Sequence, residues 1–495
     1  MSTFVSREVP AADATVAASS GPITLDQQPK TFGLLSMTLF AVSAMLVLDT
    51  VATSAAIGVQ GLSFWVLLGV TFFVPYGFIS AELGAAWPQE GGIYVWIREA
   101  FGGRFATLTA FLYWVGQPFW APSVFVLFAG TLSVVFWPSM SQGSAEILVV
   151  GLIWLVVIVG VLPVNWSKWV NNASAAAKVL VMAGIGIVGI AYAIKHGTAN
   201  SFALNQWKPS FGAEWGYLPI IIYSFMGFEL MNSAGAAIKH PKRDVPKMIF
   251  MSGAVLLGAY MLATFGILAC LKVHDLSIVT GIADAMKLAF DSILAGYSWL
   301  YDALMVVLLF TFVGNMVTWS IGANHSMAAT GLDKTAPRVF GHVNQRFRTP
   351  DYAFVLFGLV ATVITVVNYS LFANKQSVFW TIFALSSIIF LLPYLAMFPA
   401  LLVLRIKQPD IARPYVVPGG KKGAWLSVLL GEIGVVFAII AFFWLVPQGT
   451  PRMTYWGITG GGTVLSVVVG WWLGRKAPVS PPAPTSARTA EVASV

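Results

Sequence analysis

Long, uninterrupted runs of apolar residues dominate the chain from residue 33 to residue 474. A helix needs about 20 apolar residues to cross the hydrocarbon core of a bilayer, and the runs have roughly that length. They do not alternate between apolar and polar positions, so they predict helices rather than the strands of a barrel. An additional short helix is expected at 281–295. The twelve predicted segments are 33–57, 62–86, 104–137, 145–164, 173–195, 216–238, 248–271, 299–330, 352–373, 377–404, 424–446 and 454–474.

The composition indicates a protein whose solvent is largely lipid. Hydrophobic residues make up 58% of the 495 residues, charged residues make up 10%, and the mean hydropathy is +0.80. Roughly a quarter of the residues of a soluble domain are charged, so this chain cannot cover a water-facing surface. The predicted fold class is therefore an all-α membrane protein with one helical domain at 31–474. The polar segments 1–30 and 475–495, rich in Ala, Ser and Pro, are predicted to be disordered arms.

The distribution of lysine and arginine predicts the orientation. Most of these residues lie in the loops that follow even-numbered segments, and the positive-inside rule makes those loops cytoplasmic. Both termini are then cytoplasmic as well, in a multi-pass protein of a bacterial inner (plasma) membrane. The net charge of +8 reflects this bias rather than a surface for nucleic acid. Residues 1–30 also lack the apolar core of a cleaved signal peptide.

Few side chains offer catalytic or metal-binding chemistry. Cys270 is the only cysteine, which excludes a disulfide framework and a cysteine metal site. The five histidines, at positions 196, 240, 274, 325 and 342, show no ligand spacing. No nucleophile–base pair is evident, so we expect neither an enzyme nor a metal or other cofactor. A channel or a sensor is disfavoured, because a channel suggests a smaller repeated subunit and a sensor suggests a soluble output domain.

Three ionisable residues inside apolar segments are candidates for function, because a charge at the bilayer centre costs at least about 2.5–3.5 kcal/mol on insertion scales. Asp49 follows the first helical stretch, where Asp, Thr and β-branched residues weaken helix continuity. It either contacts an ammonium group of a ligand or carries a proton, or it lies at the outer interface. Glu229, beside Gly227, is either functional or a structural tie to another helix. Lys178 either extends to the interface or acts as a cation between helices.

Five residues in the apolar segments differ from the other aromatic and polar positions, because each sits beside polar or small residues. A cation out of water needs carboxylates or aromatic faces as partners. These five could line a site, although any one such residue is more often a packing residue than a ligand contact. They are Tyr113, Trp114, Gln117, Tyr223 and Trp319.

Three sequence blocks resemble the amino acid–polyamine–organocation family. GFISAELGAAWPQEGGIYVWIREAFG (77–102) resembles its second helix and following turn. YSFMGFELMNSAGAAIKHPKRDVPKMI (223–249) resembles its sixth helix, and residues 314–337 resemble its eighth helix and loop. Within that family, bacterial glutamate/γ-aminobutyrate antiporters and plant-type polyamine carriers are the most similar members.

The resemblance implies a LeuT-like fold, with a five-plus-five inverted repeat, two extra helices, and first and sixth helices broken at mid-membrane. A substrate site between the breaks would be formed by Val47, Leu48, Asp49, Thr50, Tyr223, Ser224, Phe225, Met226, Gly227, Glu229 and Trp319. Tyr223 takes the place of the gating aromatic. Lys178 matches a lysine that replaces a sodium ion in several members, and coupling is expected to involve Lys178 and Asp49.

One departure from the family pattern concerns the first break. Amino-acid carriers typically have a Gly-Ser-Gly run there, whose small residues let a substrate carboxylate reach backbone N–H groups. This chain has Met45 to Asp49 without glycine, and Asp49 would repel a carboxylate unless it is protonated. Asp49 could instead meet the ammonium group of the substrate, or the substrate could have no carboxylate.

The predicted function is secondary active transport of amino acids or their decarboxylated amines by alternating access, either as an antiporter or as a proton-coupled permease. The alternative is proton-coupled uptake of a polyamine or another organic cation, with Glu229 as a second acidic contact. The expected partners are a small amino acid or amine and the lipid bilayer, and not nucleic acid. The exact substrate, its direction and the oligomeric state stay open.

Overall fold

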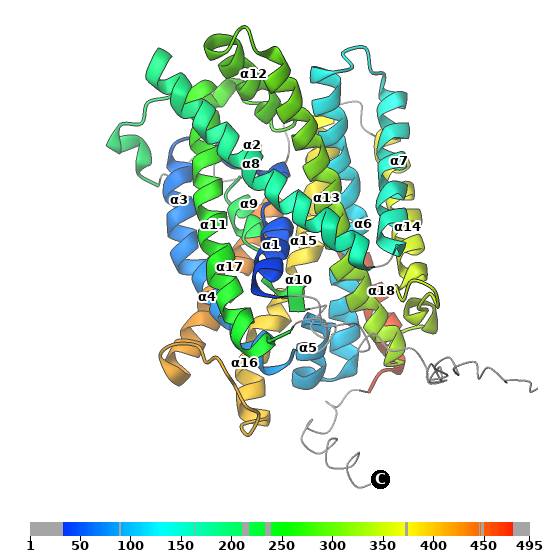
Figure 1. Cartoon of the computed structure of the whole chain (residues 1–495). Helices are drawn as coiled ribbons and strands as arrows, with labels where there is room; N and C mark the ends of the chain where they lie inside the picture. The colour runs from blue at the N-terminus through cyan, green and yellow to red at the C-terminus, as the bar shows by residue number, and fades with distance from the viewer. Residues whose placement is uncertain are drawn as a thin grey trace, which may run out of the picture.

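The computed structural model describes residues 33–88, 91–162, 164–209, 217–232, 239–371, 375–444, 446 and 450–478. All regular secondary structure in these ranges is helical. Figure 1 shows the long helices side by side in one bundle, with α12 (Gly281–Ile293) at one end and α5 (Ile93–Phe101) at the other. The expected short helix at 281–295 is thus α12.

Eleven helical spans in these ranges are long and apolar enough to cross a membrane, which confirms the predicted fold class. The expected sixth segment, 216–238, contains two short helices, and its residues 216 and 233–238 lie outside the described part of the chain. The uninterrupted long helices are α6 (Gly103–Val135), α7 (Gln142–Val161), α8 (Val164–His196), α11 (Pro241–Cys270), α13 (Ser298–Leu332), α14 (Asp351–Leu371), α17 (Gly420–Trp444) and α18 (Arg452–Leu473).

The first and sixth segments are interrupted near the residues that the sequence indicated. In the first, α1 (Leu34–Met45) is followed by two non-helical residues, the 3₁₀ turn η2 (Leu48–Thr50) and α2 (Val51–Ala55). In the sixth, α9 (Pro219–Ser224) and α10 (Phe228–Asn232) are separated by three residues. Gly227 has φ +127° there, a conformation that side chains rarely tolerate. Both interruptions expose backbone polar groups in the interior of the bundle.

Two other spans contain irregularities that hydropathy alone does not reveal. The second consists of α3 (Gln60–Leu68), a π-helical turn at Gly69–Phe73 and α4 (Val74–Ala86). The tenth consists of α15 (Lys375–Leu391) and α16 (Tyr394–Lys407), joined by a turn at 392–393. Pro393 cannot donate a backbone hydrogen bond, so the helix restarts there. This turn places Tyr394 at the beginning of the second half of the span.

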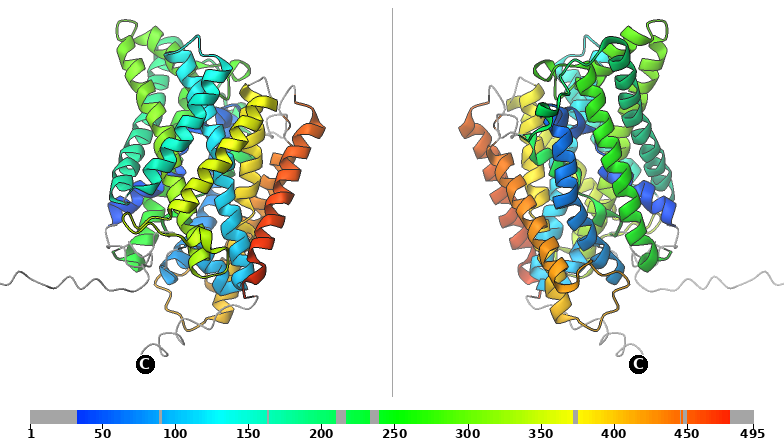
Figure 2. Two further views of the ribbon diagram at one scale, coloured as in Figure 1. Left: turned by 90° about the vertical axis from the view of Figure 1, so that its right-hand side faces the viewer. Right: turned by 90° about the vertical axis from the view of Figure 1, so that its left-hand side faces the viewer.

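The outermost helices present apolar side chains to the outside. Figure 2 shows α17 and α18, in orange and red, along one edge of the bundle. Leu465, Val468 and Trp472 of α18 are more than half exposed, as lipid-facing residues are expected to be. Residues 475 and 476, which the sequence assigned to the disordered tail, belong to the turn η9 (Gly474–Lys476), and the Pro478 carbonyl accepts a hydrogen bond from the Arg104 N–H at 3.2 Å. The segments 1–30 and 479–495 lie outside the described residues.

Candidate binding site between two helix breaks

At the first break, a tyrosine from another helix satisfies the exposed backbone. The Tyr260 hydroxyl of α11 accepts a hydrogen bond from the Val47 N–H at 2.8 Å and donates to the Met45 carbonyl at 2.7 Å. The Tyr260 ring stacks on Trp65 at 4.4 Å. Buried backbone groups without partners are costly, so this hydroxyl stabilises the break and also occupies its N–H group.

Side chains from two other helices bind the last carbonyls of α1. The buried Lys178 ammonium of α8 donates to the Ser43 carbonyl and to the Asn315 side chain of α13. The Trp319 indole of α13 donates to the Ala44 carbonyl at 2.7 Å. Helix C-terminal carbonyls carry partial negative charge, so a cation is favourable there. Lys178 therefore lies between the first and eighth spans rather than at the interface.

The second break has a similar tyrosine cap. The Tyr76 hydroxyl of α4 accepts hydrogen bonds from the N–H groups of Gly227 and Phe228, both at 2.9 Å. Its own proton is donated to the carboxylate of Glu229. A Cβ added at Gly227 would lie 2.9 Å from the Met45 side chain, so the two breaks are in close contact. Ser224 and Thr50 add a direct hydroxyl–hydroxyl bond of 2.8 Å between them.

Three tyrosine hydroxyls surround the carboxylate of Glu229. Besides Tyr76, the donors are Tyr113 of α6 at 2.9 Å and Tyr394 of α16 at 2.6 Å. The side chain of Glu229 is fully buried. No lysine, arginine or histidine of the described residues lies within ion-pairing distance of it. Hydrogen bonds alone therefore compensate the burial of this acid.

Asp49 is the second buried carboxylate, and its two oxygens have different surroundings. Its Oδ2 accepts a hydrogen bond from the Trp120 indole of α6 at 3.0 Å. Its Oδ1 has no hydrogen-bond partner among the described residues, and the residue is only 2% exposed. Buried polar atoms are usually paired, so this oxygen is available to a hydrogen-bond donor. Asp49 is therefore inside the bundle and not at the outer interface.

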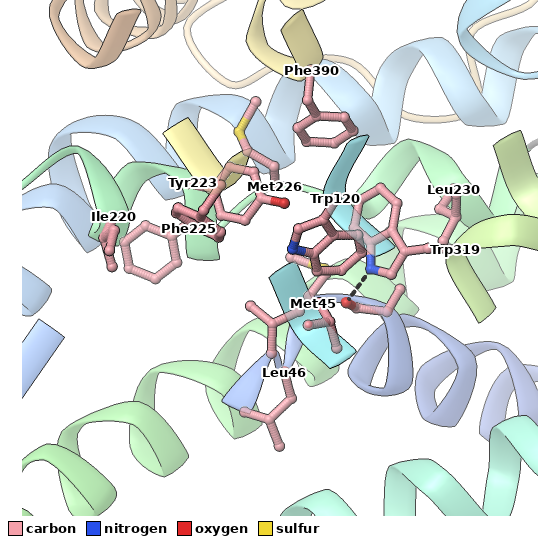
Figure 3. Close-up of a cluster of buried hydrophobic side chains, with 14 of the residues drawn as sticks. Met45, Leu46, Trp120, Ile220, Tyr223, Phe225, Met226, Leu230, Trp319 and Phe390 are labelled. Carbon is pink, nitrogen blue, oxygen red and sulfur yellow. Dashed lines mark hydrogen bonds between the residues drawn. The ribbon is translucent and has the colours of Figure 1, made fainter. Parts of the chain in front are cut away.

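An aromatic cluster extends from one carboxylate to the other. Figure 3 shows Trp120, Tyr223, Trp319 and Phe390 facing one another, with the dashed bond from Trp319 to α1. The Trp120 and Trp319 ring centroids are 5.7 Å apart, and Trp319 lies 6.4 Å from Tyr113. Because Trp120 binds Asp49 and Tyr113 binds Glu229, the cluster connects the two acids through direct contacts.

The residues expected at the site fall into two groups. Tyr223 contacts Trp120 and Phe390 edge-on, and Met226 lies beside them in Figure 3. Phe225 instead stacks on Phe73 at 4.5 Å, on the other side of the break, where it supports packing. Val47, Leu48, Asp49, Thr50, Tyr223, Ser224, Phe225, Met226, Gly227, Glu229 and Trp319 are all buried.

Sequence reasoning missed four residues that complete this arrangement. Tyr76, Trp120, Tyr260 and Tyr394 lie on four different helices and bond to the breaks or to the two acids. Each sits in an apolar run where an aromatic residue normally indicates packing or lipid contact. Tyr76 and Tyr394 carried a local signal, because a proline directly precedes each of them. Of the remaining aromatic candidates, Trp114 bonds to Asn324 at 2.9 Å, outside the cluster.

Polar networks hold the helix ends together at the end of the bundle that carries α5. The buried carboxylate of Glu82 accepts from Arg405 of α16, at 2.8 Å to its Nε, and from the Val417 N–H at 2.8 Å. Asp333 accepts from Arg98 and from the Tyr94 hydroxyl. Burial, and next the charge of Asp333, raise the pKa of Tyr94 above its ordinary value, so this hydroxyl remains a donor.

Comparison with known proteins assigns the chain to a group of carriers. The family model described as "Amino acid permease" matches residues 32–464. A probable agmatine/putrescine antiporter of Lactococcus lactis is 30% identical over 410 residues, which cover 83% of this chain and 87% of that protein. A glutamate/γ-aminobutyrate antiporter of the same organism is 23% identical over 434 residues, which cover 83% of this chain and 82% of that protein.

The fold matches a solved transporter at low sequence identity. The crystal structure of a manganese transporter mutant from Eremococcus coleocola aligns with a TM-score of 0.57 and 14% identity. The alignment covers 89% of this chain and 94% of that one. At this identity the likeness concerns the fold alone.

Proposed function

As a member of the amino acid permease family, the chain is a secondary transporter, and we propose that it exchanges cationic amines that carry no carboxylate. Family membership confirms the resemblance of the three sequence blocks. The family and the two relatives are transporters rather than enzymes. The geometry of the site bears on which charged groups a substrate can carry.

The free oxygen of Asp49 is the observation that carries the proposal. Oδ1 lacks a partner, while Oδ2 is fixed by Trp120. Tyr223 and Trp319 pack edge-on against Trp120, with ring centroids 6.3 and 5.7 Å away, and the faces of aromatic rings are electron-rich. A carboxylate beside aromatic faces, out of water, is the environment that an ammonium or guanidinium group requires. We assign Asp49 as the contact of one cationic end of the substrate.

The site disfavours a substrate carboxylate for two reasons. The N–H groups of Val47, Gly227 and Phe228 are already bonded to the Tyr260 and Tyr76 hydroxyls. In addition, each half-helix after a break has a carboxylate of the protein in its first turn, Asp49 in η2 and Glu229 in α10. A negative group placed near either end would meet like charge instead of free donors.

Glu229 provides a second region of negative potential at the far side of the aromatic cluster. Tyr113 and Tyr394 donate their protons to this carboxylate, which leaves their oxygen lone pairs free to accept. We propose that the second cationic end of a diamine binds these hydroxyl oxygens, with Glu229 behind them. The methylene chain between the two ends would lie against Trp319 and Phe390, which are 5.1 Å apart.

The relatives favour the same substrate class. Agmatine and putrescine, named for the 30% identical relative, each have two cationic ends on a short methylene chain and no carboxylate. Glutamate and γ-aminobutyrate, named for the 23% identical relative, both have carboxylates. We propose that this chain accepts amines of the first kind, with Tyr223 closing over them as the gate.

Lys178 is proposed to take the role that a sodium ion has in related folds. Its ammonium bonds to the Ser43 carbonyl and Asn315, and so joins the end of α1 to α13. A fixed cation at this place makes transport independent of sodium. Replacing external sodium by N-methylglucamine is therefore expected to leave the exchange rate unchanged.

The test is counterflow into proteoliposomes. Vesicles loaded with unlabelled agmatine, putrescine, glutamate or γ-aminobutyrate are diluted into the same labelled compound, with and without an imposed pH gradient. Acceleration by internal diamines alone supports amine exchange. Acceleration by the amino acids alone contradicts the proposal. Uptake of diamines driven by the pH gradient, without internal substrate, would replace exchange by the alternative of proton-coupled amine uptake.

A further inference from the structure

A basic hollow opens at the end of the bundle that is predicted to face the cytoplasm, away from the two breaks. Its volume is about 440 Å³, within the usual range of ligand pockets. It lies between the loop that follows α13 and the end of α18, two segments more than 130 residues apart in the chain. The lining residues are Lys334, Thr335, Ala336, Pro337, Arg338, Trp472, Leu473, Arg475 and Lys476.

The lining carries four cations and no acidic residue. Lys334 and Arg338 come from the loop, and Arg475 and Lys476 come from η9. None of the four forms an ion pair within the ranges that the structure describes. The neighbouring Asp333 is bound instead by Arg98 and Tyr94. The hollow therefore has a concentrated positive potential that matches an anion.

Hydrogen bonds and a ring contact order the wall of the hollow. Thr335 is buried, and its N–H and hydroxyl bond to the Thr330 carbonyl at 2.9 and 3.1 Å. The Arg475 guanidinium is held over the Trp472 ring, 4.2 Å from its centroid. Lys334 adopts φ +57°, a conformation that costs a non-glycine residue of order 1 kcal/mol or more and that often marks a functional position. The cations of both segments thus line one space.

The surroundings indicate that the anion belongs to a lipid. Leu465, Val468 and Trp472 recur at three- and four-residue steps, so they form one exposed apolar face of α18 that leads to the hollow. Exposed tryptophan is typical of the headgroup level of a bilayer. Leu332 and Val339 add exposed apolar side chains close to the loop. A soluble anion would use the cations but would leave this apolar face without a role.

We propose that this hollow binds the phosphate headgroup of an anionic phospholipid, with an acyl chain along the exposed face of α18. The phosphodiester would contact Arg475, Lys476 and Arg338. Basic pockets between helices at the cytoplasmic surface recognise such headgroups in membrane proteins generally. Because the loop directly continues α13, which carries Trp319, the bound lipid would also stabilise the end of a site helix.

The test measures the thermal stability and lipid retention of the purified, delipidated full chain. The protein is titrated with phosphatidylglycerol, with phosphatidylcholine of the same acyl chains, and with inorganic phosphate. We expect phosphatidylglycerol alone to raise the unfolding temperature and to remain bound in native mass spectrometry. Equal stabilisation by phosphatidylcholine would overturn the site. Equal stabilisation by inorganic phosphate would overturn the lipid as its ligand.

Charge variants make the test specific. The double variant Arg475→Gln, Lys476→Gln is expected to need about 30-fold more phosphatidylglycerol for the same stabilisation, from the usual contribution of two surface cations. The control Lys421→Gln, Lys422→Gln removes two exposed cations at the start of α17 and should behave as wild type. An equal loss in both variants would overturn the proposal. If the first variant fails to fold, Lys334→Gln with Arg338→Gln provides the same comparison.

Discussion

The two helix breaks are built alike, but their buried carboxylates have different sets of hydrogen-bond partners. At each break, one tyrosine hydroxyl from another helix binds exposed N–H groups, Tyr260 at the first and Tyr76 at the second. Each following half-helix has a buried carboxylate in its first turn. Glu229 receives three hydroxyl donors, whereas Asp49 receives one indole N–H and keeps an unpartnered oxygen.

The difference separates an anchored acid from an available one. A buried group with all its partners holds the structure together, because moving it exposes an unpaired charge. A buried carboxylate with a free oxygen gains most when a cation arrives. We therefore expect changes at Asp49 to affect transport and changes at Glu229 to affect both transport and stability.

The largest effect is expected from Asp49→Asn. The amide keeps the shape of the side chain but loses the charge that binds an ammonium, and a charge-assisted hydrogen bond contributes roughly 1.5–3 kcal/mol. Counterflow of diamines should fall by about 100-fold, while the unfolding temperature stays within a few degrees of wild type. Asp302→Asn, on the exposed outer turn of α13, is the matched control. Full activity of Asp49→Asn would refute the assigned contact.

Glu229→Gln should produce the second largest effect and should act on both properties. The amide has a single acceptor oxygen, so its NH₂ replaces the oxygen that accepts either from Tyr76 or from Tyr113 and Tyr394, and those hydroxyls lose their acceptor. We expect diamine exchange to fall by about 10- to 30-fold and the unfolding temperature to drop, since a buried unsatisfied group costs about 1–3 kcal/mol. Exchange of monoamines should fall less. Glu432→Gln in α17, which lies outside the site, is the control, and an equal loss in both variants would contradict the distinction.

Tyr260→Phe tests the cap at the first break. The ring can still stack on Trp65, but the Val47 N–H and the Met45 carbonyl lose their partner. We expect about a tenfold loss of diamine exchange. The freed N–H group should also make γ-aminobutyrate a better competitive inhibitor than it is for wild type. Unchanged inhibition would show that the cap does not exclude carboxylates.

Tyr394→Phe is expected to have the smallest effect. Two of the three donors to Glu229 remain, and the carboxylate keeps a partner on each oxygen. We predict a threefold to tenfold rise in the diamine concentration at half-maximal counterflow, at the scale of one ordinary hydrogen bond of about 1 kcal/mol. Tyr455→Phe, whose hydroxyl bonds to the Phe442 carbonyl outside the site, is the control. An equal rise in both variants would argue against a substrate contact at residue 394.

Local sequence determined the helices and the places where they break. Long apolar runs require helices in lipid because no water can satisfy the backbone there, and the Asp-Thr cluster after Leu48 and the glycine at 227 identify the two interruptions. The same reasoning marked Asp49, Lys178 and Glu229 as candidates, because a charged residue inside an apolar run is rare and can be recognised from the local sequence. The family blocks then supplied the pairing of the two breaks.

Only the tertiary structure decided which partners those groups have. Tyr76, Tyr113 and Tyr394 converge on Glu229 from three helices, and Trp120 reaches Asp49 from a helix about 70 residues further along the chain. An apolar run has the same hydropathy whether a tyrosine in it faces lipid, packing or a carboxylate. Hydrogen bonds between distant helices depend on helix rotation and packing, which no local pattern records. For this reason the free oxygen of Asp49, on which the proposed substrate chemistry rests, is visible only in three dimensions.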